Sequence, residues 1–259
     1  HVRAYAPDLL EELEGVAAGS GLDLDELMLL QIRNQLRPEG ACTGVALAAG
    51  QTAVGQGLVA QNWDNDPARL SLTNKIAKAM LEKTAPKGTD VLLDYGTGTG
   101  LIALEFRPHV KKIVAVDSNE EMQAFLRKKL AAAAITTIEP LAWSIGDDPQ
   151  ELPRFDIIIV SLTLHHVMDT ARAAGVLYSL LNSGATIAVA DFDPDNGESH
   201  GPGMNVHPGF VRADLGEIFR NAGFTGIQVE DVATLTKASS KTGTLREFPV
   251  FLMTAHKAG

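Results

Sequence analysis

The sequence predicts an α/β fold whose core is a doubly wound, mostly parallel sheet of seven strands. From about residue 70 onwards, short apolar runs alternate with segments of helical periodicity, which is the pattern of strands joined by crossover helices. Residues 155–161 form an almost continuous β-branched run, as expected for a strand that is buried on both faces. Sheets of this kind bind ligands beyond the carboxyl ends of their strands.

The expected elements follow in order along the chain. We expect helices at residues 71–83, 100–107, 119–133, 170–182 and 209–222. We expect strands at residues 91–95, 112–117, 135–143, 155–161, 185–191, 225–235 and 249–256. Asp117 or Ser118 can cap the helix near residue 119, and Pro140 weakens the third strand. Residues 70–259 are therefore one domain, and residues 1–69 are an appendage of two helices and a hairpin.

The composition is typical of a globular protein, with 259 residues of which 45% are hydrophobic and 21% charged. A net charge of −10 argues against a protein that tracks nucleic-acid phosphates. Cys42 is the single cysteine, which excludes an internal disulfide. No apolar stretch approaches the roughly 20 residues of a membrane span, and the first residues lack a signal-peptide pattern. We expect a cytoplasmic protein that binds neither membranes nor nucleic acid.

A glycine-rich turn between the first expected strand and the next helix is the most informative motif. Asp94 ends an apolar run, and Gly96, Gly98 and Gly100 follow at alternate positions. Because glycine has no Cβ, these residues let the backbone approach a ligand closely. The next apolar run ends in Asp117, and a carboxylate at a strand tip suits the two hydroxyls of a ribose. The sequence therefore predicts a nucleoside cofactor.

The spacing of the glycines separates this motif from the G-x-G-x-x-G of dinucleotide-binding folds. The pattern here is D-x-G-x-G-x-G, and Leu101 occupies the position of the last dinucleotide glycine. Together with residues 164–167, 180–184 and 222–224, this motif resembles class I S-adenosylmethionine-dependent methyltransferases. The resemblance covers about residues 70–259 and implies S-adenosylmethionine as the cofactor.

The resemblance also implies roles for single residues. Asp94 would organise the glycine loop, and Asp117 would accept hydrogen bonds from both ribose hydroxyls. Asp147 would contact the adenine, with Asp148 as an immediate rival, and Ser161 would face the cofactor through its backbone. The implied cofactor-binding set is Asp94, Gly96, Thr97, Gly98, Gly100, Asp117, Ser118, Asp147 and Ser161. The alternative for the acids is a capping role in turns and helices.

Histidines beyond the fourth and fifth expected strands are the candidate catalytic residues. Orientation of the acceptor does most of the work in methyl transfer, but an oxygen or nitrogen acceptor must also lose a proton, which a histidine can take. His166 is our first choice for this base and His165 the second. His200 and His207 lie in a polar loop expected to cover the acceptor. For each histidine the alternative is an ordinary hydrogen-bonded loop residue, and we assign no metal ligands.

The first 66 or so residues do not fit the methyltransferase pattern. Residues 41–47 and 57–60 are typical of a hairpin, and this region resembles the processing site of penicillin acyltransferase-like N-terminal nucleophile hydrolases. The resemblance implies Cys42 as a nucleophile and Asp64 as a supporting residue. However, the strands that such a fold needs are missing, and Ala41 replaces the more usual glycine. The alternatives are a buried Cys42 and a hairpin edge that pairs two subunits into a homodimer.

Three functions from different classes are therefore weighed. The leading one is methyl transfer from S-adenosylmethionine to an oxygen, nitrogen or carbon nucleophile of a small molecule, because no basic tract favours RNA or DNA. The second is a Cys42-dependent acyltransferase or amidase, which predicts cleavage between Ala41 and Cys42. The third is a cofactor-binding assembly module without turnover. The sequence alone does not identify the acceptor.

Overall fold

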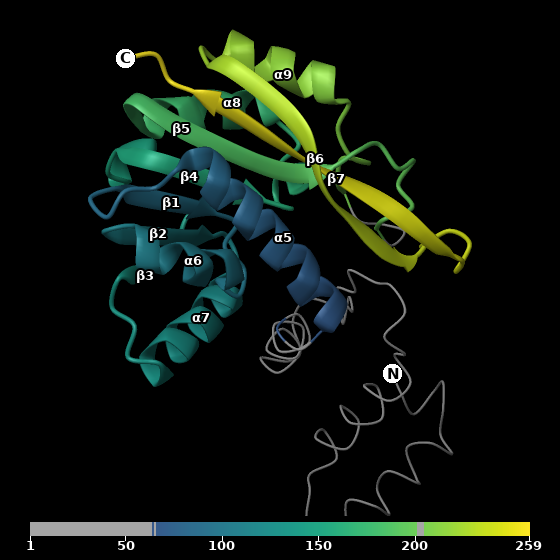
Figure 1. The fold of residues 1–259 in the computed structure, drawn as a ribbon, viewed down its shortest axis with the longest axis horizontal. Coiled ribbons are helices and arrows are strands. Elements are labelled where there is room, and N and C mark those ends of the chain that lie inside the picture. The colour runs from purple at the N-terminus through teal and green to yellow at the C-terminus, as the bar shows by residue number, and fades with distance from the viewer. Residues whose placement is uncertain (1–63, 65, 201–204) are drawn as a thin grey trace, which may run out of the picture. The chain divides into compact units, whose positions relative to one another are not determined.

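The computed structural model describes residues 64, 66–200 and 205–259. Within these ranges, seven strands form one sheet in the order β3-β2-β1-β4-β5-β7-β6 (Figure 1). Neighbours from β3 to β5 pair in parallel, and β7 runs antiparallel between β5 and β6. The predicted doubly wound, mostly parallel sheet is confirmed.

The bounds of the elements are as follows. The strands are β1 (Val91–Tyr95), β2 (Lys112–Asp117), β3 (Ile138–Ala142), β4 (Phe155–Ser161), β5 (Leu181–Phe192), β6 (Thr225–Ala238) and β7 (Leu245–His256). The helices are α5 (Pro67–Thr84), α6 (Leu101–Phe106), α7 (Glu120–Ala132), α8 (Thr170–Leu180) and α9 (Arg212–Asn221). The 3-10 turns are η1 (Arg107–His109), η2 (Pro149–Glu151) and η3 (Leu164–His166).

The core lies in two layers, one on each face of the sheet. Successive strand residues point to opposite faces, so Leu92 and Ile159 pack on one side and Leu93 and Ile158 on the other. Helices α5, α6 and α7 cover the first face, and α8 and α9 cover the second (Figure 1). Burial on both faces explains why the central strands are apolar throughout. The polar residues that follow these strands are left at the carboxyl edge of the sheet.

Several elements differ in detail from the prediction. Helix α7 is capped by Asn119, whose side chain accepts hydrogen bonds from two backbone N–H groups, and not by Asp117 or Ser118. Strand β3 is shorter than expected, and Pro140 is tolerated there because β3 is an edge strand. Helix α8 ends at Leu180 because β5 begins at the next residue.

The N-terminal end of the described range is helix α5. It begins at Pro67, earlier than predicted, because Asp66 caps it by accepting hydrogen bonds from the backbone N–H groups of Ala68 and Arg69. Cys42 and the predicted hairpin lie outside the described residues, so the division at residue 69 and the homodimer stay predictions. Among the described residues, no helix is both long and apolar enough to cross a bilayer.

Candidate functional site

The loop between β1 and α6 folds over the end of β2. The backbone N–H groups of Gly96 and Thr97 both donate to the carbonyl of Val116, each at 2.9 Å. Gly96, Gly98 and Gly100 all have positive φ, at 76°, 53° and 78°. This left-handed conformation is readily adopted only by glycine, which accounts for the alternating glycines of the motif.

The three glycines have different surroundings. A Cβ on Gly96 would lie 2.1 Å from the Thr163 side chain, and one on Gly100 would lie 2.6 Å from Leu126. A Cβ on Gly98 would meet no atom within 4 Å. The backbone of Gly98 therefore faces open space at the carboxyl edge, which is the side on which a ligand would approach the loop.

Asp94 lies beneath this loop and is 2% exposed. Its carboxylate accepts a hydrogen bond from the Thr97 hydroxyl at 2.7 Å. Burial raises the pKa of Asp94 to about 7, the Thr97 hydrogen bond opposes this rise, and the charge of Asp117 adds to it. Asp94 thus ties the loop to β1, as its expected organising role requires.

Asp117, at the tip of β2, contacts the same loop. One carboxylate oxygen accepts from the Gly98 N–H at 3.0 Å, and the other accepts from the Asn119 N–H at 2.9 Å. Each oxygen has a second lone pair, so the half-buried carboxylate keeps acceptor capacity for further donors. Ser118 follows it and is exposed. The structure therefore brings Asp94, the glycines and Asp117 together.

The loop after β3 carries the two acids that are candidates for the adenine contact, and β3 is the neighbour of β2 in the sheet. Asp147 is exposed and accepts from the Ser144 N–H at 2.7 Å, while Asp148 caps η2 by accepting from the Gln150 N–H. Both acids thus close their own turns. Burial is the main cause of the raised pKa of Tyr95. The negative charges of Asp117 and Asp147 also raise it. The choice between Asp147 and Asp148 as adenine contact stays open.

On the other side of the loop, the segment after β4 carries a pair of adjacent histidines. His165 is 2% exposed, and its Nδ1 lies 2.7 Å from a carboxylate oxygen of Asp191 at the end of β5. The same carboxylate accepts from the backbone N–H of His165 at 3.1 Å. Because a carboxylate can only accept, Nδ1 carries a proton, and Nε2 is the ring nitrogen that stays available for another partner.

His200 and His166 complete a cluster around His165. The ring of His165 lies 4.2 Å from that of His166 and 4.7 Å from that of His200, measured between centroids. His200 is buried and its Nδ1 lies 2.7 Å from the Ser199 hydroxyl, whereas His166 is exposed. Desolvation and the neighbouring His165 lower the pKa of both His166 and His200 to about 4. The backbone N–H of His207 donates to the His165 carbonyl at 2.8 Å, but its ring faces elsewhere, with Nε2 3.1 Å from the carbonyl of Val167.

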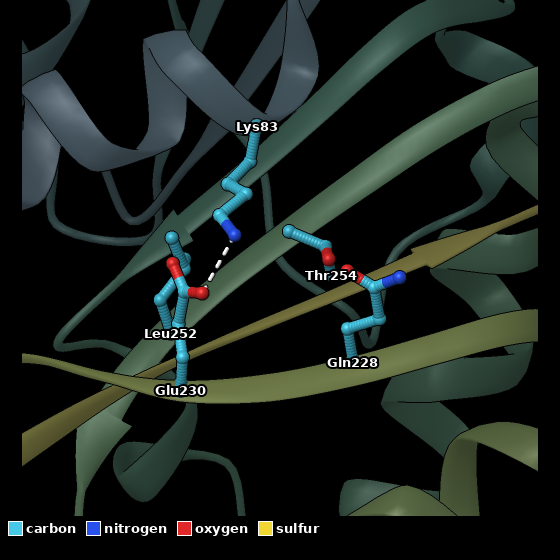
Figure 2. A pocket seen from close by; sticks show the side chains of 5 residues that line it. All are labelled: Lys83, Gln228, Glu230, Leu252 and Thr254. Carbon is cyan, nitrogen blue, oxygen red and sulfur yellow. Dashed lines mark hydrogen bonds and ion pairs between the residues drawn. The ribbon is translucent and has the colours of Figure 1, made fainter.

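A separate depression lies between α5 and the β6–β7 hairpin, and its empty space of about 140 Å³ includes open solvent. Figure 2 shows Lys83 reaching across it to Glu230, with an Nζ–Oε2 distance of 2.6 Å. Ligand pockets commonly measure about 300–1,000 Å³. The depression is therefore too small for a nucleoside cofactor, and its lining residues include none of the predicted site residues.

Comparison with known proteins identifies the family to which this architecture belongs. A family model described as a methyltransferase domain matches residues 67–229. The chain belongs to this family. Among curated relatives, an uncharacterised methyltransferase of Schizosaccharomyces pombe is 26% identical over 182 residues, which is 63% of each chain. One of Mycobacterium tuberculosis is 32% identical over 117 residues, covering 44% of this chain and 56% of the relative.

The chain thus spans between 56% and 63% of the length of these curated methyltransferases. Among solved structures, a S-adenosylmethionine-dependent methyltransferase from Aquifex aeolicus aligns with a TM-score of 0.56 and 21% identity. That alignment covers 77% of this chain and 97% of the other. At this identity the likeness shows a shared methyltransferase fold.

Sequence reasoning missed three residues of this candidate site. Thr163 packs against Gly96, and its hydroxyl donates to the carbonyls of Ser161 at 2.9 Å and Gly96 at 3.3 Å, so it joins the end of β4 to the glycine loop. Asp191 contacts the His165 ring at 2.7 Å, and the charges of Asp117 and Asp147 act on Tyr95 at the end of β1. Each lies at the end of an apolar strand or just beyond it, and this position is the signal that could have drawn attention to them.

Proposed function

We propose that the chain transfers a methyl group from S-adenosylmethionine to an oxygen, nitrogen or carbon nucleophile of a small molecule. The observation that carries the proposal is the open backbone face of Gly98, held beside the Asp117 carboxylate by a 3.0 Å hydrogen bond. This arrangement offers close backbone approach and a ribose acceptor at one point of the carboxyl edge. Family membership supports the choice of methyl donor.

The donor-binding residues divide the work between the two parts of the cofactor. The glycine loop, braced by Asp94 and Thr97, would lie against the methionine portion, and Asp117 would accept from the ribose hydroxyls. Asp147 would contact the adenine and Ser161 would contribute its backbone. The residues fit the group, because Gly98 leaves room that any side chain would take and Asp117 retains unused lone pairs.

The sulfonium of bound S-adenosylmethionine supplies an activated methyl group, so the protein must mainly hold the acceptor in line with it. The histidine cluster is well placed for this task, because Thr163 contacts the glycine loop two residues before His165. His166 is the exposed member of the cluster and would reach the acceptor, and we keep it as the candidate base. The net charge of −10 argues against a nucleic-acid acceptor, and a small molecule is the most economical choice, with a protein acceptor as the alternative.

The first experiment is calorimetric titration of the purified chain with S-adenosylhomocysteine. Micromolar binding at one site per chain is expected. Turnover is then followed as S-adenosylhomocysteine release over a panel of small phenols, amines and carboxylic acids. His166→Ala should lower turnover more than it changes cofactor affinity, and a fully active variant would remove His166 as the base.

The other outcomes separate the rival functions. Cofactor binding without turnover on any acceptor would support the assembly module. Absence of binding, combined with two fragments on a denaturing gel that separate Ala41 from Cys42, would support the acyltransferase. Neither rival has a specific observation in its favour among the described residues.

A further inference from the structure

The cluster formed by His165, His166 and His200 contains buried ring nitrogens without hydrogen-bond partners among the described residues. The Nε2 atoms of His165 and His200 are buried and have no hydrogen-bond partner within the described ranges. A buried polar atom without a partner costs about 1–3 kcal/mol, so native proteins seldom leave one unused. Two such atoms at one place indicate that something else satisfies them.

The other nitrogen of each buried ring is already fixed in place. Asp191 holds His165 through Nδ1 at 2.7 Å, and Ser199 holds His200 through Nδ1 at 2.7 Å. A carboxylate or hydroxyl that orients one ring nitrogen while the other stays available is the usual outer contact of a metal-binding histidine. Here each orienting residue contacts Nδ1, so the Nε2 atom of each buried ring is left without a partner among the described residues.

We propose that His165, His166 and His200 bind one divalent first-row transition metal ion, with Zn²⁺ as the expected occupant. One ring nitrogen from each of the three histidines can be chosen so that these three atoms lie within 4.8 Å of one another. Nitrogen ligands at the usual Zn–N distance of about 2.0–2.1 Å lie about 3.3 Å apart in a tetrahedral site. The cluster therefore needs a contraction of up to about 1.5 Å, to which the exposed side chain of His166 can contribute by rotation.

The donor set selects the class of metal. Three neutral imidazoles suit Zn²⁺ and its neighbours in the first row, whereas Mg²⁺ and Ca²⁺ prefer oxygen ligands. Asp191 and Asp195 bring negative charge to the cluster and offset the Lys237 ammonium, which donates to the Ser199 carbonyl. Three protein ligands would leave a fourth position of a tetrahedral site for water or another oxygen ligand.

The role of that fourth position rests on the proposed function. An acceptor oxygen bound there would be held next to the glycine loop, and the metal charge would favour its deprotonated form. Metal coordination would then perform the task for which the sequence suggested His166 as a base. Metal binding itself is independent of methyl transfer, so the two proposals fail separately.

The test uses the full chain after treatment with a chelator. Calorimetric titration with ZnCl₂ near pH 7.5 should give one site per chain, and Co²⁺ should give the visible absorption bands of a tetrahedral site. His166→Ala should weaken Zn²⁺ binding about 100-fold or more. Because His166 is exposed, this change should leave the thermal melting curve intact. The matched control is His109→Ala, in exposed η1 away from the cluster, which should bind Zn²⁺ normally.

A second variant tests the orienting carboxylate. Asp191→Asn keeps the size of the side chain but weakens its hold on His165, and should lower Zn²⁺ affinity about 10–100-fold. Absence of Zn²⁺ binding would overturn the proposal, and so would binding that neither variant weakens. A chain that binds Zn²⁺ but not S-adenosylhomocysteine would keep the metal site and lose the proposed function.

Discussion

At the scale of single residues, the three glycines of the loop occupy the same backbone region for different reasons. Gly96 and Gly100 are required by their neighbours, because a Cβ would enter Thr163 or Leu126. Gly98 has no such neighbour. We attribute the glycine at this position to its positive φ and to the open space beside its backbone, which a ligand can approach. The loop is thus anchored at two glycines and exposed at the third.

This difference predicts opposite behaviour for two alanine variants. Gly98→Ala should cost only about 1–2 kcal/mol of stability, the expense of a left-handed alanine, but should abolish detectable S-adenosylhomocysteine binding. Gly96→Ala should lower the free energy of unfolding further, because its Cβ also collides with Thr163. Urea unfolding and calorimetric titration measure the two effects. Normal cofactor binding by Gly98→Ala would place the ligand elsewhere.

Asp117 gives a second prediction at this scale. Asp117→Ala should weaken S-adenosylhomocysteine binding by about 1–3 kcal/mol, because the ribose hydroxyls lose their acceptor. The Gly98 N–H also loses its partner, so some loss of stability should accompany it. Glu120→Ala is the matched control, since Glu120 is exposed, nearby in the sequence and outside the predicted cofactor-binding set. Unchanged affinity in Asp117→Ala, measured by calorimetry, would refute the ribose assignment.

The residue scale also marks where sequence reasoning stopped. The spacing of Asp94, the glycines and Asp117 predicted a loop that the structure assembles, because all of them lie within two adjacent strand ends. The cluster of His165 and His200 was not predicted, since these residues are far apart in sequence. Only the pairing of β4 with β5, which places Asp191 beside His165, brings them together.

At the scale of elements, helix α5 is held in place by the side chains that it buries against the sheet. Its apolar positions Leu72, Ile76 and Met80 are buried in the same core layer as Leu92 of β1. The helix contacts strands β4 to β7, so it joins the parallel and antiparallel parts of the sheet (Figure 1). Such a helix derives its stability from the face that it buries.

The burial of α5 predicts the effect of truncating one side chain. Met80 is fully buried, so Met80→Ala should lower the free energy of unfolding by about 2–5 kcal/mol through lost contacts and a cavity. Glu82→Ala, exposed on the same helix, should change it by less than about 0.5 kcal/mol. Denaturant unfolding of the two variants provides the comparison. A loss below 1 kcal/mol in Met80→Ala would mean that α5 is not firmly docked.

Element ends were harder to predict than element types. The sequence predicted the kind and order of the described strands and α-helices. It placed the end of the sixth strand at residue 235, whereas the β6–β7 hairpin pairs as far as Ala238 with Leu245. The polar composition of this end resembles a loop, and the ladder with the neighbouring strand overrides that local preference.

At the scale of the whole molecule, the fold was predictable because its information is repeated along the chain. Every strand–helix pair carries the same alternation, so an error at one boundary leaves the topology unchanged. The candidate site has no repeated sequence pattern, so each of its residues has to be recognised separately. The histidine cluster, Thr163 and Tyr95 therefore needed the three-dimensional arrangement, whereas the sheet did not.

The stability of the whole fold should depend on pH through groups with opposing effects. In the metal-free chain, His200 is buried with its pKa lowered to about 4, so the unfolded chain binds its proton first and stability falls as pH drops from about 6.5 towards 4. His166 acts in the same direction but less, because solvent screens it. Asp94, with its pKa raised to about 7, acts in the opposite direction.

The sign for Asp94 follows from linkage and gives the last prediction. Between its ordinary pKa of 3.8 and its folded value of about 7, the folded chain holds a proton that the unfolded chain has released. Stability contributed by the protonated group is therefore present at low pH and lost as pH rises through this window, by up to about 4 kcal/mol. Asp94→Asn should consequently gain stability over the parent chain at pH 8 but much less at pH 4.5, as measured by urea unfolding at both values. The exposed Asp214→Asn should show no such pH-dependent difference. An Asp94→Asn chain that is less stable than the parent at pH 8 would mean that the carboxylate is ionised and held by the N–H and O–H groups of its loop.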